Sequence, residues 1–541
     1  MNAVVKINVN KKALISNLKM AFSTGTTWVT ELLQNARRAG ATEIRIVIDQ
    51  SQKSFTIWDN GRGIEDMQHL FLIAESGWDE PILSQEKPYG MGFLSCLFAC
   101  EKVHIISHKQ QAKVVTKDAI ALDDIHVEPH HGVEGTFIRM EGVANMPSEH
   151  VLQSAVKGFP VPVYLNQARE PLESIHAVDA LDWVKTEVGL VHIDNLGRLY
   201  RNPTIYLQGL PIYAGFSTLY ADDSVVVHLD PEKFFGRLPD RASVIDPDEA
   251  NLAIRSAINK LYAERLAQKK NAMLAQGQGR EFVKRYGSAC LTHGRELLND
   301  VPYLPTDVTS GYIEDLSVNL DQDVLSCPST PVGKQDIVDG TKKLFAGDDG
   351  RYDPENIPHM ALIDAFDGII VDTYILDAGH WVHAYVHRLK GDIRIAITEQ
   401  QSAIGIDGRF LWDGQTIVIG DILTLSGTFE FDGVPIEMGI TYNETVFDAK
   451  EQTFYVPNAS SGYGAVRQAS DYMDDDVYNE EAFDEDDTLF ARLVSEARNP
   501  DPAALLLQLL LDLGLKKYAS INGKSFHVAI AEDGAIKVTL A

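Results

Sequence analysis

The sequence predicts an α+β protein, and three observations along the chain lead to this fold class. The segment at 27 to 39 reads as a helix, and apolar alternation between residues 43 and 58 follows it. Residues 205 to 213 read as strand, turn and strand, and a long helical segment comes later, at 247 to 273. Residues 360 to 455 are rich in alternating β-branched side chains. With 541 residues, the chain is too long for one hydrophobic core.

The helix predicted at 27 to 39 carries two polar residues with complementary chemistry. Gly40 closes this helix, and Glu31 and Asn35 lie one turn apart on one of its faces. A carboxylate can take a proton from water, and an amide oxygen can ligate Mg²⁺, which prefers oxygen ligands. The pair therefore suits hydrolysis of a metal-bound phosphate. The alternative interpretation is a solvated helix face.

The strand predicted at 53 to 58 delivers a carboxylate to its end. Asp59 opens the stretch Asp-Asn-Gly-Arg-Gly-Ile at 59 to 64. Gly63 within that stretch allows the backbone to approach a ligand closely. Taken alone, its glycines are typical of ordinary turns.

A second glycine-rich segment follows a long loop. Residues 75 to 90 lack periodicity and read as a mobile loop in which Lys87 adds a positive charge. Gly90-Met91-Gly92 then opens a helix predicted from Phe93 to Cys100. The exposed amide groups and positive dipole end of such a helix suit phosphate groups.

These segments come in a defined order: Glu-Leu-Leu-Gln-Asn-Ala at 31 to 36, the 59 to 64 stretch, Tyr-Gly-Met-Gly-Phe-Leu-Ser at 89 to 95, and Gly135-Thr136. Together they resemble the GHKL superfamily of ATPases, which comprises gyrase, the ninety-kilodalton heat-shock chaperones, histidine kinases and MutL proteins. The sequence at 34 to 44 is most similar to the chaperone-like branch. The resemblance implies a two-layer α/β sandwich, the Bergerat ATP-binding fold, for residues 1 to 147.

The resemblance also implies a set of roles. Asp59 would accept a hydrogen bond from the adenine amino group, Thr136 would hold the same edge of the purine, and the loop at 75 to 90 would be the ATP lid. ATP and Mg²⁺ would be the cofactors, with Glu31 as catalytic base and Asn35 as metal ligand. The implied cofactor-binding residues are Asn35, Asp59, Gly61, Gly63, Ile64, Lys87, Gly90, Met91, Gly92, Phe93 and Thr136.

One position departs from the family pattern. Many relatives carry an acidic residue three positions after the asparagine, where this chain has Arg38. The reversed charge is expected to affect nucleotide affinity and purine selectivity more than the phosphate chemistry.

A second α/β region, at 148 to 275, resembles the transducer domain of chaperones and MutL proteins. That domain supplies a cation to the γ-phosphate of ATP, and Leu-Pro-Asp-Arg-Ala-Ser at 238 to 243 resembles the chaperone loop that does so. Arg241 is the expected catalytic cation. Arg237 and Lys233 are close competitors, and a surface charge is the alternative for all three.

Beyond residue 275 the resemblance ends. Residues 281 to 299 read as helical, and 502 to 513 as a leucine-rich helix that precedes three strands separated by Asn522-Gly523 and Asp533-Gly534. Ten acidic residues and no Lys or Arg lie between 471 and 487, which favours a solvated linker over an interaction segment. The expected domains after the ATP module are 148–275 transducer-like, 276–330 helical connector, 331–465 β-rich domain of unknown role, 466–488 acidic linker and 489–541 small α+β unit.

Two further patterns are weak. Gly523-Lys524-Ser525 ends like a phosphate-binding loop, but Tyr518 occupies the place of its first glycine, so a hairpin turn is the better interpretation. His383 and His387 would share a strand face with Tyr385 between them, and His380 lies nearby. Ordinary packing is favoured there over metal binding.

Composition favours a cytoplasmic protein. No apolar run reaches membrane length, the N-terminus lacks a secretory pattern, and four cysteines form no Cys-x-x-Cys pair. The formal net charge of −29 disfavours a surface that grips nucleic acid.

Three functional classes follow from these patterns. The first is a slow, chaperone-like ATPase that switches conformation, forms a homodimer and acts on a protein client. The second is a MutL-like or MORC-like DNA clamp or a topoisomerase-type subunit, which the charge disfavours. The third is a histidine kinase, which is disfavoured because the ATP motifs begin close to residue 1. The first class is the expected function.

Overall fold

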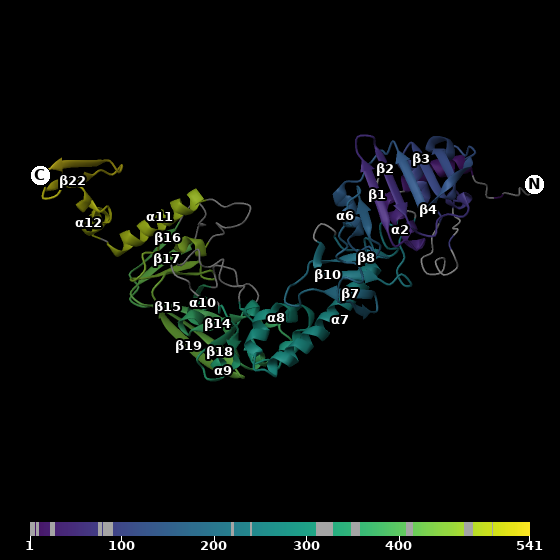
Figure 1. Cartoon of the computed structure of the whole chain (residues 1–541). Helices are drawn as coiled ribbons and strands as arrows, with labels where there is room; N and C mark the ends of the chain where they lie inside the picture. Colours follow the sequence, from purple (N-terminus) through teal and green to yellow (C-terminus); the bar gives the residue numbers. More distant parts are fainter. Residues whose placement is uncertain are drawn as a thin grey trace, which may run out of the picture. The chain divides into compact units, whose positions relative to one another are not determined.

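The computed structural model (Figure 1) describes the residues in the following ranges: 6, 10–21, 27–73, 78, 90–217, 221–238, 241–309, 328–347, 357–406, 415–469, 480–499 and 501–541. The chain divides into two compact units, Met1–Gln268 and Lys269–Ala541.

The first unit begins with a five-stranded sheet in the order β3-β4-β2-β1-β5. All its neighbouring strands are antiparallel except β1 and β5, which are parallel. The fifth strand lies beyond the predicted domain end at residue 147, and the predicted domain boundaries remain predictions. The strands are β1 (Ile44–Asp49), β2 (Ser54–Asp59), β3 (Lys102–Val115), β4 (Val127–Glu141) and β5 (Val163–Leu165).

Helices pack on one face of this sheet. Trp28 of α2 meets Phe55 of β2 edge to face, with ring centroids 4.6 Å apart. The alternation of β1 buries Ile44 and Ile46, while Val47 on the opposite face is 38% exposed. A layer of helices therefore covers one sheet face, as a two-layer sandwich requires. The helices of this region are α1 (Lys11–Leu18), α2 (Thr27–Arg38), α4 (Gly92–Ala99), α5 (Thr116–Ile120) and α6 (Glu149–Val156).

Helix α2 ends as the sequence predicts. Gly40 adopts a left-handed conformation with φ of 74°, which carries no steric cost for glycine. The Ala41 N–H donates to the Ala36 carbonyl at 3.1 Å, and the Gly40 N–H donates to Arg37 at 3.0 Å. These bonds satisfy carbonyls that the helix end leaves open.

A second sheet, in the order β6-β7-β10-β8-β9, follows in the same unit. The predicted strand–turn–strand is confirmed as β8 and β9, and the predicted long helix is confirmed as α7 (Pro247–Leu274). The turn between β8 and β9 touches the first region, because the Gln34 side chain of α2 donates to Gln208. The strands are β6 (Val184–Thr186), β7 (Gly189–Ile193), β8 (Asn202–Leu207), β9 (Leu210–Pro211) and β10 (Ala221–Leu229).

The first helix wholly within the second unit is α8 (Gly279–His293), which confirms the predicted helical segment, and the unit is then β-rich as predicted. Its larger sheets have the orders β14-β13-β15-β18-β19 and β16-β17-β21-β20. Its further helices are α9 (Lys334–Val338) and α10 (Ile357–Ala365). Its strands up to residue 457 are β11 (Tyr303–Leu304), β12 (Val332–Gly333), β13 (Lys343–Ala346), β14 (Gly368–Val371), β15 (Val386–Ile397), β16 (Ser402–Ile406), β17 (Gln415–Gly420), β18 (Leu423–Phe431), β19 (Val434–Tyr442), β20 (Val446–Asp448) and β21 (Thr453–Pro457).

Part of the predicted acidic linker is a helix, so that prediction is wrong for residues 480 to 488. These residues open α11 (Glu480–Arg498). Phe483, Phe490 and Val494 recur at helical spacing and join a core cluster. Burial of this apolar stripe outweighs the solvation that the acidic composition favours. The acidic residues before Glu480 lie outside the described residues.

The C-terminal segment has two strands where three were predicted. The helix α12 (Pro502–Asp512) is confirmed: Asp501 caps it, and Gly514 follows with φ of 61°. In residues 501–541, all of which are described, the only strands are β22 (Phe526–Ile530) and β23 (Ile536–Leu540). The segment before Gly523 instead forms turns, since it lacks apolar alternation.

His383 and His387 do not share a strand face, which corrects the sequence prediction. His380 begins a short 3₁₀ helix, Trp381–Ala384, and β15 starts only at Val386. Each ring bonds to backbone instead: the Val382 N–H donates to His380, and the rings of His383 and His387 lie 3.0 and 3.1 Å from carbonyl oxygens. Within the described part of the chain, no group of three or more His, Cys, Asp or Glu side chains is arranged to hold a metal ion.

Among the described helices, none combines the length and the hydropathy that a bilayer crossing demands. Cys96, Cys100 and Cys290 are free and buried, and Cys327 lies outside the described residues.

Candidate active site

A cavity of about 310 Å³ lies over helix α2 and the end of strand β2. This volume is within the range of small-molecule sites. Of the residues predicted from the sequence, the lining contains Glu31, Asn35, Asp59, Gly63, Ile64, Gly90, Met91, Gly92, Phe93, Thr136 and Arg241.

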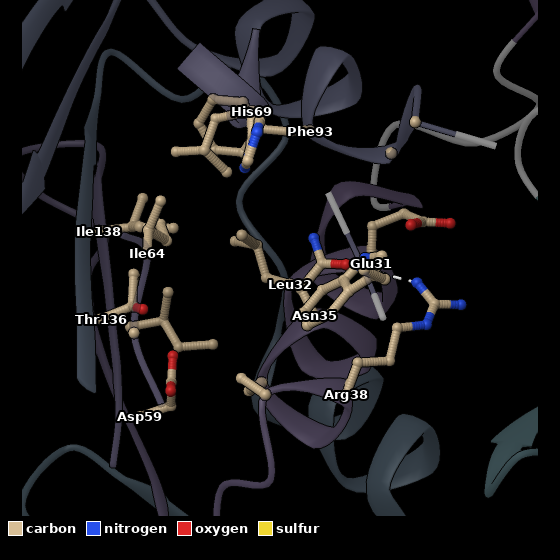
Figure 2. A pocket seen from close by; sticks show the side chains of 18 of the residues that line it. Glu31, Leu32, Asn35, Arg38, Asp59, Ile64, His69, Phe93, Thr136 and Ile138 are labelled. Atoms are coloured by element: carbon tan, nitrogen blue, oxygen red, sulfur yellow. Dashed lines mark hydrogen bonds between the residues drawn. The ribbon is translucent and has the colours of Figure 1, made fainter. Parts of the chain in front are cut away.

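One face of α2 forms one wall. Glu31, Asn35 and Arg38 follow one another at positions i, i+4 and i+7, so their side chains share that face. Glu31 and Arg38 are each only 7% exposed. Arg38 Nη1 donates to Asn35 Oδ1 at 3.4 Å, and Figure 2 shows Asp59 and Thr136 on the opposite side of the cavity.

Asp59 forms the other end of the cavity. It is the last residue of β2, it pairs with Thr136 of β4, and it is 7% exposed. The Gly61 N–H donates to its Oδ1 at 2.9 Å, which fixes the carboxylate. Burial raises the pKa of Asp59 to about 6, and the hydrogen bond from Gly61 acts in the opposite direction.

Two glycines allow the loop after β2 to lie against β3 and β4. A Cβ on Gly135, whose φ is 71°, would come within 1.9 Å of the Asp59 carbonyl oxygen. A Cβ on Gly63, with φ of 75°, would come within 2.6 Å of His108 Nε2. Ser107 bridges the two segments, because its hydroxyl accepts from the Ile64 N–H and donates to the Gly135 carbonyl, both at 2.8 Å. These glycines therefore serve close packing around Asp59.

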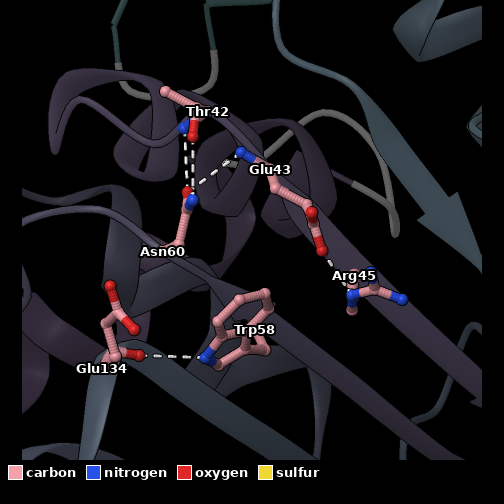
Figure 3. Close-up of polar contacts among 6 residues, drawn as sticks. All are labelled: Thr42, Glu43, Arg45, Trp58, Asn60 and Glu134. Atoms are coloured by element: carbon pink, nitrogen blue, oxygen red, sulfur yellow. Dashed lines mark hydrogen bonds and ion pairs between the residues drawn. The ribbon is translucent and has the colours of Figure 1, made fainter.

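Asn60 holds the Asp59 loop to the end of helix α2, a role the sequence reading missed (Figure 3). Its Oδ1 accepts from the N–H groups of Thr42 and Glu43 at 2.8 and 2.9 Å, and its Nδ2 donates to Thr42 Oγ1 at 2.8 Å. Trp58 Nε1 donates to the Glu134 carbonyl at 3.0 Å. The Asp-Asn-Gly pattern carried the signal, since Asn side chains commonly bond to nearby backbone.

The turn Gly90-Met91-Gly92 brings the start of α4 beside Glu31. A Cβ on Gly92 would lie 2.1 Å from Glu31 Oε2, so only glycine leaves room for the carboxylate there. Met91, the N-cap residue, makes no capping side-chain hydrogen bond within the described residues. Gly92 and Phe93 line the cavity, so the start of α4 adjoins it without a capping side chain from Met91.

Three cations were candidates: Lys233, Arg237 and Arg241. Of these, only Arg241 is among the described residues that line the cavity. Lys233 Nζ donates to the Glu187 carbonyl at 2.8 Å and lies 3.7 Å from Asp230. Arg237 Nη2 donates to the Ile245 carbonyl at 2.8 Å.

Among the predicted cofactor-binding residues that the structure describes, Gly61 alone does not line the cavity; its N–H donates to Asp59. Lys87 lies outside the described residues, as does the rest of the 75 to 90 loop except Trp78 and Gly90.

The sequence analysis also missed several residues that line the cavity. The guanidinium of one of them, Arg62, lies 5.2 Å from the centre of the Trp78 ring. These missed residues are Leu32, Ala36, Ala39, Ile57, Arg62, Glu65, His69, Leu70, Trp78, Ile138 and Leu238.

Comparison with known families agrees with this geometry for part of the chain. Residues 23–136 match the model of a family described as histidine kinase-, DNA gyrase B-, and HSP90-like ATPase. The match supports the GHKL superfamily for this segment, and domains of this type bind ATP, typically with Mg²⁺. No curated protein matches the chain.

The side chains that line the cavity fit both ATP and Mg²⁺. Asp59 offers a buried carboxylate with one oxygen held by a backbone N–H. At the other wall, the Asn35 amide oxygen and the Glu31 carboxylate provide the oxygen atoms that Mg²⁺ and its waters prefer.

Proposed function

We propose that this protein binds and hydrolyses ATP slowly and uses the nucleotide to switch the arrangement of its domains. One observation carries the proposal: a single cavity joins Asp59, the Glu31–Asn35 face of α2, the Gly90–Gly92 turn and Arg241. These groups match the needs of a purine, of a metal-bound phosphate and of a hydrolytic water.

The purine end is built around Asp59. Its ionised carboxylate accepts a hydrogen bond from the adenine amino group, and Thr136 holds the same edge. Ile64, Met91 and Phe93 supply apolar contacts, while Gly63 admits the backbone to the base. The fixed Oδ1 means that the carboxylate is oriented before the ligand arrives.

The phosphate end is built around α2 and α4. The amide groups at the start of α4 and its positive dipole end bind phosphate oxygens. Asn35 would hold Mg²⁺, which would neutralise phosphate charge when bound. Glu31 takes a proton from the attacking water, and Gly92 keeps the space beside its carboxylate open.

Arg241 supplies a cation from the second α/β region. Developing charge on the transferred phosphoryl group is stabilised by such a cation, so hydrolysis depends on the placement of this loop. The lining of the cavity by Arg241 supports this choice over Lys233 and Arg237, whose side chains contact backbone carbonyls and Asp230. The contact of Gln34 with Gln208 further ties α2 to the second sheet.

The client of this switch is proposed to be a protein, and the active form a homodimer, as in the chaperone-like branch. The net charge of −29 favours this reading over a DNA clamp. The test combines two measurements with and without a nonhydrolysable ATP analogue: affinity capture of client proteins, and salt-dependent DNA binding. Nucleotide-dependent capture of protein without DNA supports the proposal, whereas tight, nucleotide-dependent DNA binding supports a MutL-like or MORC-like clamp.

A further inference from the structure

Arg38 is a charged residue in the cavity wall to which the reaction above gives no role. Its side chain is 7% exposed and lines the cavity together with Glu31 and Asn35. A guanidinium in the wall of a ligand cavity can form charged hydrogen bonds with an anionic ligand bound there.

The position of the guanidinium selects the part of the ligand that it meets. Arg38 Nη1 lies 3.4 Å from Asn35 Oδ1, on the α2 wall and across the cavity from Asp59 (Figure 2). The guanidinium therefore lies at the level of the proposed metal ligand, not at the purine edge. A planar guanidinium matches phosphate oxygens in pairs, and it remains charged at any relevant pH.

The same contact affects the metal. An amide oxygen has two lone pairs, and the bond from Arg38 uses one of them. A fixed positive charge beside the remaining lone pair opposes a second cation there. Arg38 thus provides phosphate-neutralising charge while weakening the hold of Asn35 on Mg²⁺.

We infer that Arg38 is a specificity-determining residue that binds the polyphosphate of the nucleotide directly, so that this site retains triphosphate affinity when Mg²⁺ is removed. The inference rests on the proposed function, because it requires a nucleotide in this cavity. It also shifts the expected effect of Arg38 from purine selectivity to the phosphates.

The test compares the affinities of the full-length protein for ATP and for adenosine, by calorimetry, in magnesium chloride and in EDTA. The ratio of the two affinities isolates the phosphate contribution and corrects for any loss of folded protein. In EDTA, the wild type should prefer ATP to adenosine by about tenfold or more, as expected for charged hydrogen bonds. Arg38→Gln should lower this preference by about 10- to 100-fold and leave adenosine affinity within about twofold.

Two further variants control the comparison. Arg37→Gln makes the same charge change at the neighbouring helix position, outside the cavity lining, and should behave as the wild type. Arg38→Lys keeps the charge without the paired geometry and should retain part of the preference, which provides a second measurement where Arg38→Gln does not fold.

The outcomes separate the inference from the function. A wild type that binds adenosine and ATP equally in EDTA overturns the inference, as does an Arg38→Gln protein with the wild-type preference. Loss of adenosine affinity in folded Arg38→Gln also overturns it, by placing Arg38 at the purine. A wild type that binds neither ligand, with or without Mg²⁺, contradicts the proposed function itself.

Discussion

Helix α2 in the first unit and helix α11 in the second both bury acidic side chains, but in different surroundings. Glu31 of α2 is 7% exposed and faces a cavity that it shares with Asn35 and Arg241. Asp487 of α11 is 2% exposed, and its Oδ1 accepts a hydrogen bond from the Gly464 N–H at 2.6 Å. Gly464 is the left-handed residue that opens a 3₁₀ helix packed against α11.

The difference shows that burial of a carboxylate does not by itself indicate a reactive site. In α11 the carboxylate satisfies a backbone donor of a tight turn, so its role is structural. In α2 the carboxylate adjoins space for a ligand and other groups with matching chemistry. Changes near α2 should therefore alter turnover or binding, while changes at Asp487 should alter stability alone.

The largest effect is expected from Arg241→Ala. Turnover of ATP should fall by about a thousandfold or more, because the phosphoryl charge loses its cation, while ATP affinity stays nearly unchanged. Steady-state phosphate release and calorimetry measure the two quantities. Lys233→Ala and Arg237→Ala are the matched controls and should remain active. If one of them is inactive while Arg241→Ala turns over normally, the loop is right and the residue wrong; three active variants contradict the role of this loop.

A smaller loss is expected from Gly92→Ala. The added methyl group would lie 2.1 Å from Glu31 Oε2 and must displace that carboxylate. Displacement of a catalytic group by about 1 Å can lower turnover by about a hundredfold, and ATP affinity should change only slightly. Gly405→Ala, where a Cβ meets nothing within 4 Å, is the control. Normal turnover of Gly92→Ala would argue against Glu31 as the base.

An effect of about tenfold is expected from pH. The pKa of Asp59 is raised to about 6 by burial, so lowering the pH from 7.5 to 5 protonates the carboxylate that accepts from adenine. Adenosine affinity should then fall by about tenfold. The experiment uses adenosine in place of ATP, because the phosphate groups of ATP themselves titrate at about pH 6. His69→Gln removes a titratable ring from the cavity lining and should leave the midpoint unchanged. A flat profile removes Asp59 from the purine contact.

The same raised pKa has a consequence for folding. Because the folded-state pKa of Asp59 lies above the ordinary value of 3.8, its favourable contribution to stability is complete below pH 3.8. That contribution is lost as the pH rises through about 6, where the carboxylate ionises in the folded state. A ligand that donates a hydrogen bond to the ionised Asp59 carboxylate compensates for the stability that is lost when this group ionises.

The smallest effect on activity is expected from Asp487→Ala. It leaves the partly buried Gly464 N–H without its acceptor, which should lower the free energy of unfolding by about 1–3 kcal/mol. Urea unfolding monitored by fluorescence measures the change, and Asp487→Asn, which keeps an acceptor oxygen, should lose less. ATP affinity and turnover should equal those of the wild type. A loss of turnover in folded Asp487→Ala would break the contrast between the two helices.

Local sequence rules predicted the helix ends well, because the signals lie within the segments they control. Gly40 ends α2 as predicted, and the helices predicted at 247 to 273 and 502 to 513 are opened by Pro247 and capped by Asp501. The same rules failed for α11, whose stability depends on packing of Phe483 and Phe490 against strands far away in the sequence. Acidic composition carries no information about such partners.

The candidate site shows the same difference between local sequence signals and contacts that depend on the folded chain. Motif residues on α2, after β2 and before α4 were predicted to act together, and the cavity contains most of them. His69 was missed because no motif marks it. Trp78 and Leu238 lie in the predicted lid and in the 238–243 motif, but only the folded chain shows that their side chains line the cavity. Asn60 was within a motif, yet its bonds to Thr42 and Glu43 depend on how the loop folds back on α2.

The central claim is that the α2 cavity is an ATPase site with Glu31 as the base and Asp59 as the purine anchor. The most direct test measures ATP binding by calorimetry and phosphate release on the wild type, Glu31→Ala and Asp59→Asn. We expect Glu31→Ala to bind ATP without hydrolysing it. Asp59→Asn should not bind ATP, since an amide cannot present two acceptor oxygens. Wild-type turnover in Glu31→Ala, or unchanged ATP affinity in Asp59→Asn, would contradict the account.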